Sequence, residues 1–229
     1  PGVRFVPFGE LPELTDKTAA VILEPIQSMA GVKTAPPDYF TGLRERCDKV
    51  GAVLIYDEVQ TGFGRTVTMF FAGRHCVVPD LVTLSKGIAS GIPLSGVLVH
   101  EKIAAKVEYG EYGHTFGAGP IAMAAMKATL EIVEKLPVAE IGKYCVEKLS
   151  PFGEVRGLGL LLGLKIQGDP PSPSGLRRTS AGEIQQKLLE RGVIVGTADE
   201  PGVLRLLPPL TLQKSHVDQF VGVLHETLH

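Results

Sequence analysis

Two short, unbroken apolar runs on either side of one amphipathic segment constrain the fold of this chain more than any other feature. Residues 19–23 (AAVIL) and 52–56 (AVLIY) are typical of strands buried on both faces of a parallel sheet. Between them, Asp38 can cap a helix, and Gly51 is a natural residue to end it. The apolar face of that helix comprises Phe40, Leu43, Cys47 and Val50. Strand, helix and strand in succession predict a right-handed βαβ unit, and therefore an α/β fold.

Further elements continue this pattern along the first two thirds of the chain. Residues 81–85 and 96–99 are typical of two more strands. Gly119-Pro120 opens a helical stretch rich in Ala and Met, from Ile121 to about Lys135, and Pro137 marks its end. We therefore expect a large α/β domain with a connecting helix over residues 1–150.

From residue 151 the sequence pattern changes to short, glycine-punctuated strands and a Pro/Ser/Gly loop. Residues 155–166 are strand-like and punctuated by glycine, and 168–175 form a loop of Pro, Ser and Gly. Ser180 with Glu183 forms a capping box for a further helix. The remaining expected features are the end of that helix at Gly192, short strands at 193–195 and 203–207, and a last helix capped at Ser215 with Val217, Phe220, Leu224 and Leu228 on one face. These elements predict a small α+β domain over residues 151–229.

Composition narrows the classes of function. The 229 residues are 44% hydrophobic and 21% charged, which is ordinary for a globular protein. The net charge is −2 and there is no basic run, so neither nucleic acid nor an anionic membrane is an expected partner. No apolar stretch approaches the roughly 20 residues that a membrane span needs. Cys47, Cys76 and Cys145 lack paired or metal-ligand spacing and indicate reduced thiols of a cytoplasmic protein without a metal site.

Polar residues follow three of the predicted strands: Glu24, Asp57-Glu58 and Ser85-Lys86. In an open parallel sheet, ligands bind outside the carboxyl ends of the strands. A carboxylate at such an end is more often a cap or a loop contact, whereas a lysine with a buried stem would have a lowered pKa and would favour an imine with a carbonyl. A lysine and an aspartate at adjacent strand ends are one way to hold pyridoxal phosphate, because the carboxylate keeps the ring nitrogen protonated. The chemistry alone leaves this as one hypothesis among several.

Seven sequence blocks occur in order and together resemble one family. They are Glu24-Pro-Ile-Gln27, Asp57-Glu-Val-Gln-Thr-Gly-Phe-Gly-Arg-Thr66, Pro79-Asp80, Ser85-Lys-Gly87, His114-Thr-Phe116, Val155-Arg-Gly-Leu-Gly159 and Leu204-Arg-Leu-Leu-Pro-Pro-Leu210. Over essentially the whole chain they resemble the class III pyridoxal-phosphate aminotransferases, most of all the acetylornithine/ornithine branch. The resemblance implies a fold-type-I PLP-transferase, with part of the mostly parallel sheet of the large domain followed by the small domain.

The resemblance also implies a cofactor site. Lys86 matches the lysine that forms the Schiff base with pyridoxal 5′-phosphate and moves a proton as general acid and base. Asp57 matches the aspartate paired with the pyridine nitrogen, Val59 would pack on the ring, and Gln60 would reach the phenolic oxygen. Thr115 matches a threonine that donates to the cofactor phosphate across a subunit interface, so a homodimer is implied as well.

Substrate contacts follow from the same resemblance. Arg205 matches the arginine that grips the substrate α-carboxylate in a bidentate geometry that lysine would not reproduce. Glu24 matches the glutamate that pairs with this arginine in ornithine-type members. Arg65 is better explained as a brace of its loop, and His114 as structural, because no partner nucleophile or metal cluster is visible around it.

The chain departs from the family pattern in several places. Residues 117–120 read Gly-Ala-Gly-Pro where Gly-Gly-Asn-Pro is usual, and Val67 stands where a glycine is common. The N-terminal arm, the first strands and the phosphate-binding loop of the family have no counterpart before Pro1. With four strands of the large sheet, we expect an uncovered sheet edge and exposed apolar surface, which a longer chain or a dimer would cover.

The expected function is transamination of the terminal amino group of a basic amino acid such as acetylornithine or ornithine, with 2-oxoglutarate as acceptor. Two alternatives stay open. One is an aminotransferase-like module that is truncated and catalytically inactive. The other is a class III member with a different donor, such as 4-aminobutyrate.

Overall fold

The computed structural model describes residues 2–113, 115, 117–166 and 180–228, and these form two compact units. The first unit comprises the residues up to Pro25, Ala35–Gly64 and Thr68–Lys135. The second comprises Ile26–Thr34, Arg65–Val67 and the residues from Leu136 onward. No helix in the described part of the chain is long and apolar enough to cross a membrane.

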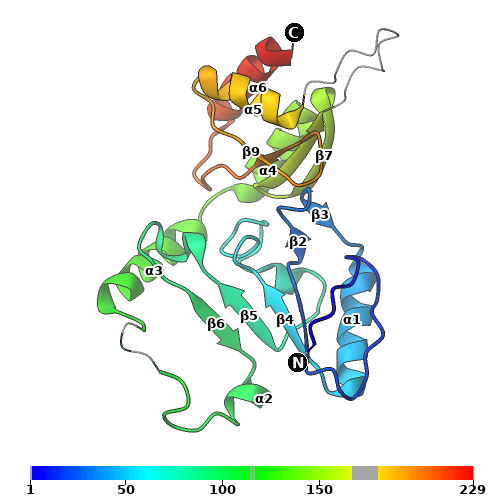
Figure 1. Cartoon of the computed structure of the whole chain (residues 1–229). Coiled ribbons are helices and arrows are strands. Elements are labelled where there is room, and N and C mark those ends of the chain that lie inside the picture. The colour runs from blue at the N-terminus through cyan, green and yellow to red at the C-terminus, as the bar shows by residue number, and fades with distance from the viewer. Residues whose placement is uncertain (1, 114, 116, 167–179, 229) are drawn as a thin grey trace. The chain divides into compact units, whose positions relative to one another are not determined.

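A four-stranded sheet forms the centre of the first unit (Figure 1). Its strands are β1 (Ala20–Leu23), β4 (Val53–Asp57), β5 (Leu81–Leu84) and β6 (Gly96–Val99), and they lie in the order β1-β4-β5-β6. The pairs β1-β4 and β4-β5 are parallel, and β6 is antiparallel to β5. The predicted mostly parallel sheet is therefore confirmed, and parallel pairing brings the carboxyl ends of β1, β4 and β5 to one edge.

Helix α1 (Pro37–Val50) connects β1 to β4 and ends, as predicted, at Gly51 in the left-handed conformation (φ 75°). The prediction that Asp38 caps this helix is wrong: the N-cap residue is Pro36, and Asp38 lies in the first turn. Pro37 explains the shift, because a proline at the first helical position has its φ already set and has no N–H to leave unsatisfied. In the first turn, the Asp38 carboxylate lies near the positive end of the helix dipole.

The expectation that the strands are buried on both faces is also wrong. One face, carrying Tyr56 and Val82, is buried under α1 and under α3 (Pro120–Val133). The opposite face carries the row Ile22, Ile55, Leu81 and Val99. Ile22 is 63% exposed and Val99 is 42% exposed. With four strands of the large sheet in this chain, exposed apolar surface was expected. The exposed side chains on this face agree with that expectation.

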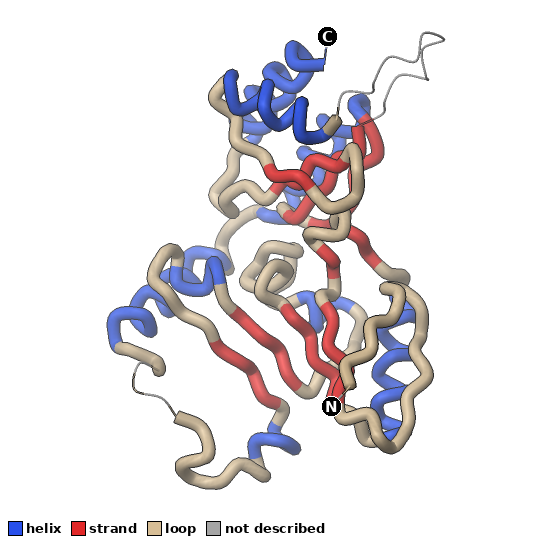
Figure 2. The backbone as a smooth tube through the Cα atoms, viewed as in Figure 1, coloured by secondary structure: helices blue, strands red, loops and turns tan. Residues whose placement is uncertain are grey.

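In the second unit, helices pack against an antiparallel sheet (Figure 2). The sheet has the order β7-β8-β10-β9, and the predicted strand at 193–195 is wrong because the pairing starts at Gly196. The elements are β7 (Gly153–Leu158), β8 (Leu161–Ile166), β9 (Gly196–Thr197), β10 (Val203–Leu206), α4 (Val138–Leu149), α5 (Ala181–Glu190) and α6 (Lys214–Leu228). The capping box of Ser180 and Glu183 is confirmed, whereas Ser215 lies inside α6 and does not cap it. The loop predicted at 168–175 lies outside the described residues.

The two units divide the chain differently from a single boundary at residue 150. Helix α4 belongs to the second unit, because its apolar face (Val138, Ile141, Cys145 and Leu149) is part of the same core as α5, α6 and the sheet. Two segments from the first half of the chain also belong to the second unit. They are the Arg65–Val67 turn and a hairpin formed by β2 (Ile26–Gln27) and β3 (Lys33–Thr34), whose strand β3 lies next to β7.

The remaining short elements are η1 (Phe71–Arg74), η2 (Lys86–Ala89), α2 (Glu101–Ala104) and η3 (Ser150–Phe152). Of these, η1 and η2 lie in the first unit, beside the strand ends that carry the candidate site.

Candidate active site

Asp57 and Lys86 follow adjacent parallel strands. Asp57 is the last residue of β4 and pairs in register with Thr83 of β5. Lys86 lies two residues beyond the end of β5, at Leu84. Because β4 and β5 run in the same direction, both residues belong to the carboxyl edge of the sheet, where open parallel sheets bind ligands.

The Asp57 carboxylate is oriented by two hydrogen bonds, both to Oδ1. The Thr83 hydroxyl donates to it at 3.1 Å, and the Val59 backbone N–H donates at 3.0 Å. The first bond comes from the neighbouring strand and the second from the turn that follows β4. Strand register and turn geometry together therefore fix the rotamer of a half-buried acid.

Glu58 fixes the turn that carries Val59 and Gln60. Its side chain is 2% exposed and accepts hydrogen bonds from Phe71 N–H (2.6 Å), Ala72 N–H (2.9 Å) and the Thr61 hydroxyl (3.1 Å). Burial raises the pKa of Glu58, against the opposing effect of these three donors. The sequence marked Glu58 as polar at a strand end but gave it no role, because its two backbone donors lie on η1, more than ten residues further along the chain.

Lys86 begins η2 with a left-handed backbone, φ 50°. Such a conformation in a non-glycine residue costs roughly 1–3 kcal/mol and is concentrated at functional sites. The segment is held in place because Ile88 and Ala89 are buried in a cluster with side chains of α3. The Ser85 hydroxyl also donates to the Leu94 carbonyl at 3.3 Å, which anchors the chain just before Lys86.

The structure does not provide the buried stem that would desolvate the Lys86 amine. The residue is exposed, because it lies beyond the last paired position of β5, Leu84 opposite Gly96. Lys86 therefore has an anchored backbone and an amine that is accessible to solvent and not desolvated.

The other predicted residues of the first unit lie in two places. Val59 and Gln60 are half-buried in the turn after Asp57, and half-buried Glu24 directly follows β1 at the same edge of the sheet. Thr115 is exposed on the segment between α2 and α3. Its expected partner is a phosphate across a subunit interface, so its role stays a prediction.

Arg205 lies on β10 of the second unit. It donates through Nη1 to the hydroxyl of Ser28 at 3.2 Å. Its Nε is buried and has no hydrogen-bond partner among the described residues. A buried N–H without an acceptor costs roughly 1–3 kcal/mol, so the guanidinium is suited to a ligand that brings an oxygen.

Arg65, in the same unit, is a brace, as the sequence favoured. Its guanidinium donates to the carbonyl of Leu160 (3.2 Å) and to that of Pro208, and burial lowers its pKa to about 10. The Leu160 N–H in turn donates to the Arg65 carbonyl at 3.0 Å. These reciprocal bonds attach the 65–67 turn to the second unit.

Known proteins resemble this chain over nearly its full length. The sequence profile of the family "Aminotransferase class-III" matches residues 9–228. Acetylornithine aminotransferase of Methanocaldococcus jannaschii is 38% identical over 241 residues, covering 99% of this chain and 58% of the relative. The corresponding enzyme of Aquifex aeolicus is 39% identical, covering 94% of this chain and 55% of the relative.

Solved structures give the same fold. Ornithine aminotransferase from Plasmodium yoelii superposes with a TM-score of 0.78 at 30% identity, covering 91% of this chain and 56% of that one. An amine transaminase from an uncultivated Pseudomonas species, solved in a PLP-bound form, has a TM-score of 0.78 at 35% identity, with 91% and 51% covered. The chain thus spans a little more than half the length of the curated relatives that it matches.

Proposed function

The chain belongs to the aminotransferase class-III family, and we propose that it carries the cofactor-binding lysine and aspartate and the carboxylate-binding arginine of a transaminase. Members of this family are pyridoxal-phosphate-dependent aminotransferases with the fold-type-I architecture. The two curated relatives and the Plasmodium yoelii enzyme act, by their names, on acetylornithine or ornithine, which favours a basic amino acid with a terminal amino group as donor. As acceptor we propose a 2-oxo acid, 2-oxoglutarate first.

The observation that carries the proposal is the pairing of Asp57 and Lys86 at the ends of two adjacent parallel strands. The cofactor needs an acid at its ring nitrogen and an amine at its aldehyde carbon, on opposite sides of one ring. An acid oriented by Thr83 and Val59 N–H, beside an anchored and accessible lysine, meets both needs. The residues present therefore fit the group.

When bound, pyridoxal phosphate supplies an electron sink for the negative charge that develops at the amino acid Cα. Asp57 would hold the proton on the ring nitrogen. Lys86 would hold the aldehyde carbon through its ε-amino group and then move the proton at Cα. Val59 would pack on the ring, and the Gln60 amide would donate to the phenolic oxygen.

The proposed roles of the remaining residues concern the substrate and the assembly. Arg205 would bind the substrate α-carboxylate, and Glu24 would pair with that arginine and release it for the second substrate. Thr115 would donate to the phosphate of a cofactor bound by a second copy, so the proposal includes a homodimer. A cytoplasmic location is part of it as well, consistent with the free thiols of Cys47, Cys76 and Cys145.

The test is turnover by the full chain with added pyridoxal phosphate and 2-oxoglutarate, with glutamate as the measured product. Acetylornithine and ornithine should be used well above 4-aminobutyrate, and Lys86→Ala should abolish turnover. Lys106→Ala is the matched control, because Lys106 is another exposed lysine of the same unit. Preference for 4-aminobutyrate would replace the proposed donor, and no turnover with any donor would favour the inactive module.

A further inference from the structure

Ser28 holds one end of the Arg205 guanidinium. The Ser28 side chain is fully buried, and its Oγ accepts a hydrogen bond from Nη1 of Arg205 at 3.2 Å. The two residues are far apart in sequence and lie in the same unit. A buried acceptor on a guanidinium nitrogen selects one orientation of a long side chain that otherwise has many rotamers.

The position of Ser28 is itself set by packing of the β2–β3 hairpin within the second unit. Val32, at the far side of the hairpin turn, is fully buried and donates through its N–H to the Ser28 carbonyl at 3.2 Å. Its side chain lies over two glycines: a Cβ on Gly157 would be 2.9 Å from Val32, and one on Gly163 would be 3.0 Å from it. A larger residue at Gly163 would press on the hairpin, whereas a Cβ on Gly157 would first meet the Leu161 carbonyl oxygen.

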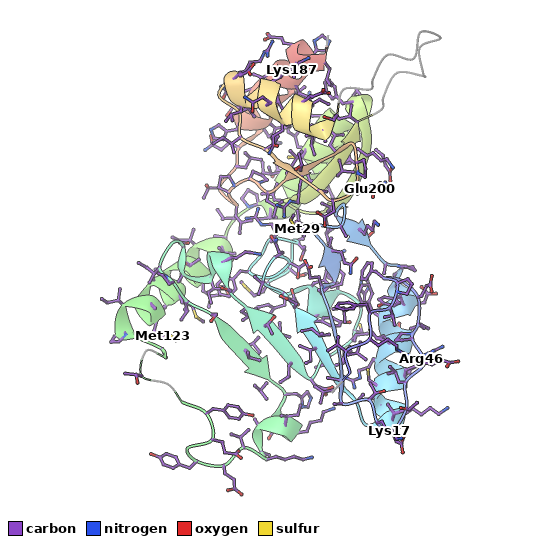
Figure 3. All side chains as sticks on the ribbon, in the orientation of Figure 1. Lys17, Met29, Arg46, Met123, Lys187 and Glu200 are labelled. Atoms are coloured by element: carbon purple, nitrogen blue, oxygen red, sulfur yellow. The ribbon has the colours of Figure 1, made fainter. Side chains whose placement is uncertain are left out.

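A second contact fixes the exposed side of the same turn. The Asp199 N–H donates to the Met29 carbonyl at 2.8 Å, and a Cβ on Gly31 would lie 2.7 Å from the Glu200 carboxylate. Figure 3 labels Met29 and Glu200, which mark these two segments of the second unit. Ser28 is therefore presented by a turn that is fastened on both sides.

Arg205 has a glycine as its register partner on each neighbouring strand, so no side chain of these partners covers its Nε. Its register partners are Gly163 on β8 and Gly196 on β9. A Cβ on Gly196 would lie 3.5 Å from Nε. Nε is buried without a partner among the described residues, whereas Nη1 is held by Ser28. A carboxylate can bind a guanidinium side-on through the pair of donors Nε and Nη2, here called the fork. Ser28 binds Nη1, which is not part of that fork.

Arg156, one strand beyond Gly163 in the same row, shows the contrast. Its guanidinium is neutralised by two carboxylates, with Nε 2.7 Å from Glu154 and Nη1 2.7 Å from Glu200. At Arg205 the corresponding nitrogen, Nη1, is held by a neutral hydroxyl, which orients the guanidinium.

We propose that Ser28 is a positioning residue, which holds Nη1 of Arg205 so that the Nε/Nη2 fork faces a substrate carboxylate. This inference rests on the proposed function, because it takes Arg205 as the residue that binds the substrate. It adds that affinity for the carboxylate of the 2-oxo acid depends on a hydroxyl that itself contacts no substrate.

The first experiment compares Ser28→Ala with the wild type under steady-state conditions. The KM for 2-oxoglutarate should rise by about tenfold, the usual scale for one hydrogen bond to a charged group, with kcat changed much less. The KM for the basic amino acid donor, which binds before Glu24 releases Arg205, should stay the same. The control is Thr227→Val, which removes another buried hydroxyl of the same unit, one that donates to the Val223 carbonyl. Equal changes of KM for acceptor and donor, or none for either, would overturn the inference.

A second experiment needs no turnover. The Nε–H resonance of Arg205, identified by its loss in Arg205→Lys, is followed by NMR during titration of the full chain with glutarate. A saturable shift is expected in the wild type, with affinity about tenfold weaker in Ser28→Ala. Should Ser28→Ala fail to fold, Ser28→Gly takes its place. An unresponsive Nε–H, or equal affinities in wild type and variant, would overturn the inference, whereas absent transamination alone would count only against the proposed function.

Discussion

The Thr83 hydroxyl donates a hydrogen bond of 3.1 Å to Oδ1 of Asp57, its register partner across the parallel pair β5 and β4. The two side chains stand on the same face of the sheet because register partners do so in any ladder. The backbone N–H of Val59 donates to the same oxygen. The orientation of Asp57 thus follows from secondary structure, before any cofactor binds.

Replacing Asp57 by Asn should lower kcat by about 10²–10³-fold, the range for loss of one preorganised electrostatic contact. Asn keeps the size of the side chain but cannot hold the proton of the ring nitrogen as a carboxylate does. Thr83→Val should cost much less, because Val59 N–H still orients Oδ1. Steady-state kinetics of both variants check this, and an Asp57→Asn variant with wild-type kcat would remove Asp57 from the site.

Replacing Glu58 by Gln should destabilise the protein by about 1–3 kcal/mol. The carboxylate accepts from two backbone N–H groups, and a Gln side chain would aim an NH₂ donor at one of them. Urea unfolding measures the loss, with exposed Glu10→Gln as the control.

Burial raises the pKa of Glu58, so the unfolding free energy of the wild type should also fall as the pH rises from the unfolded-state pKa to the folded one. Glu58→Gln should lack this component.

Asp80 should give the opposite pH dependence. It is 2% exposed and accepts from Leu54 N–H (2.7 Å) and Arg44 (2.9 Å), and it forms an ion pair with Lys102. Burial opposes ionisation, but the bonds from Lys102, Leu54 and Arg44 hold the pKa of Asp80 below its usual value.

The contribution of Asp80 to stability is therefore complete above its unfolded-state pKa, about 4, and is lost as the pH falls through the lower folded-state value. Asp80→Asn should cost about 3 kcal/mol at pH 7, as expected when one partner of a buried pair is removed. Acid titration followed by circular dichroism should show a smaller loss of stability below pH 4 in the variant. An unchanged acid transition would contradict the account.

Val67→Gly should stabilise the protein by about 1 kcal/mol. Val67 has φ 80°, a left-handed conformation that is strained for a β-branched residue, and it is 38% exposed, so little buried surface is lost. Thermal unfolding should show a higher Tm. Val78→Gly is the control, because Val78 is 64% exposed without a positive φ. That variant should have a lower Tm, and a matching fall for Val67→Gly would show that the strain is absent.

The sequence predicted those elements whose cause is local. Apolar runs marked β4 and β5, and Ser180 with Glu183 marked the start of α5. It did not predict which core α4 would join, because an apolar face at helical spacing fits any apolar surface of the right shape. The one-sided burial of the strands was missed for the same reason, since burial of Ile22 depends on what lies above it.

The candidate site likewise has features with a local cause, which the sequence predicted, and features that depend on tertiary packing, which it did not. Lys86 and Asp57 could be predicted because strand ends and family motifs are visible in the sequence. The exposure of Lys86 and the donors around Glu58 could not, because they depend on where η2 and η1 lie. The bond from Arg205 to Ser28 joins segments far apart in sequence, and no local pattern marks it.

Covalent attachment of the cofactor tests the central claim most directly. The full chain is mixed with pyridoxal phosphate, its absorbance is read at about 420 nm, the band of a protonated imine, and the product is reduced with borohydride and mapped by peptide mass. The account predicts the band and a pyridoxyl group on the Lys86 peptide in the wild type and in Lys106→Ala, and neither in Lys86→Ala. The same band and the same modified peptides in all three proteins would contradict it.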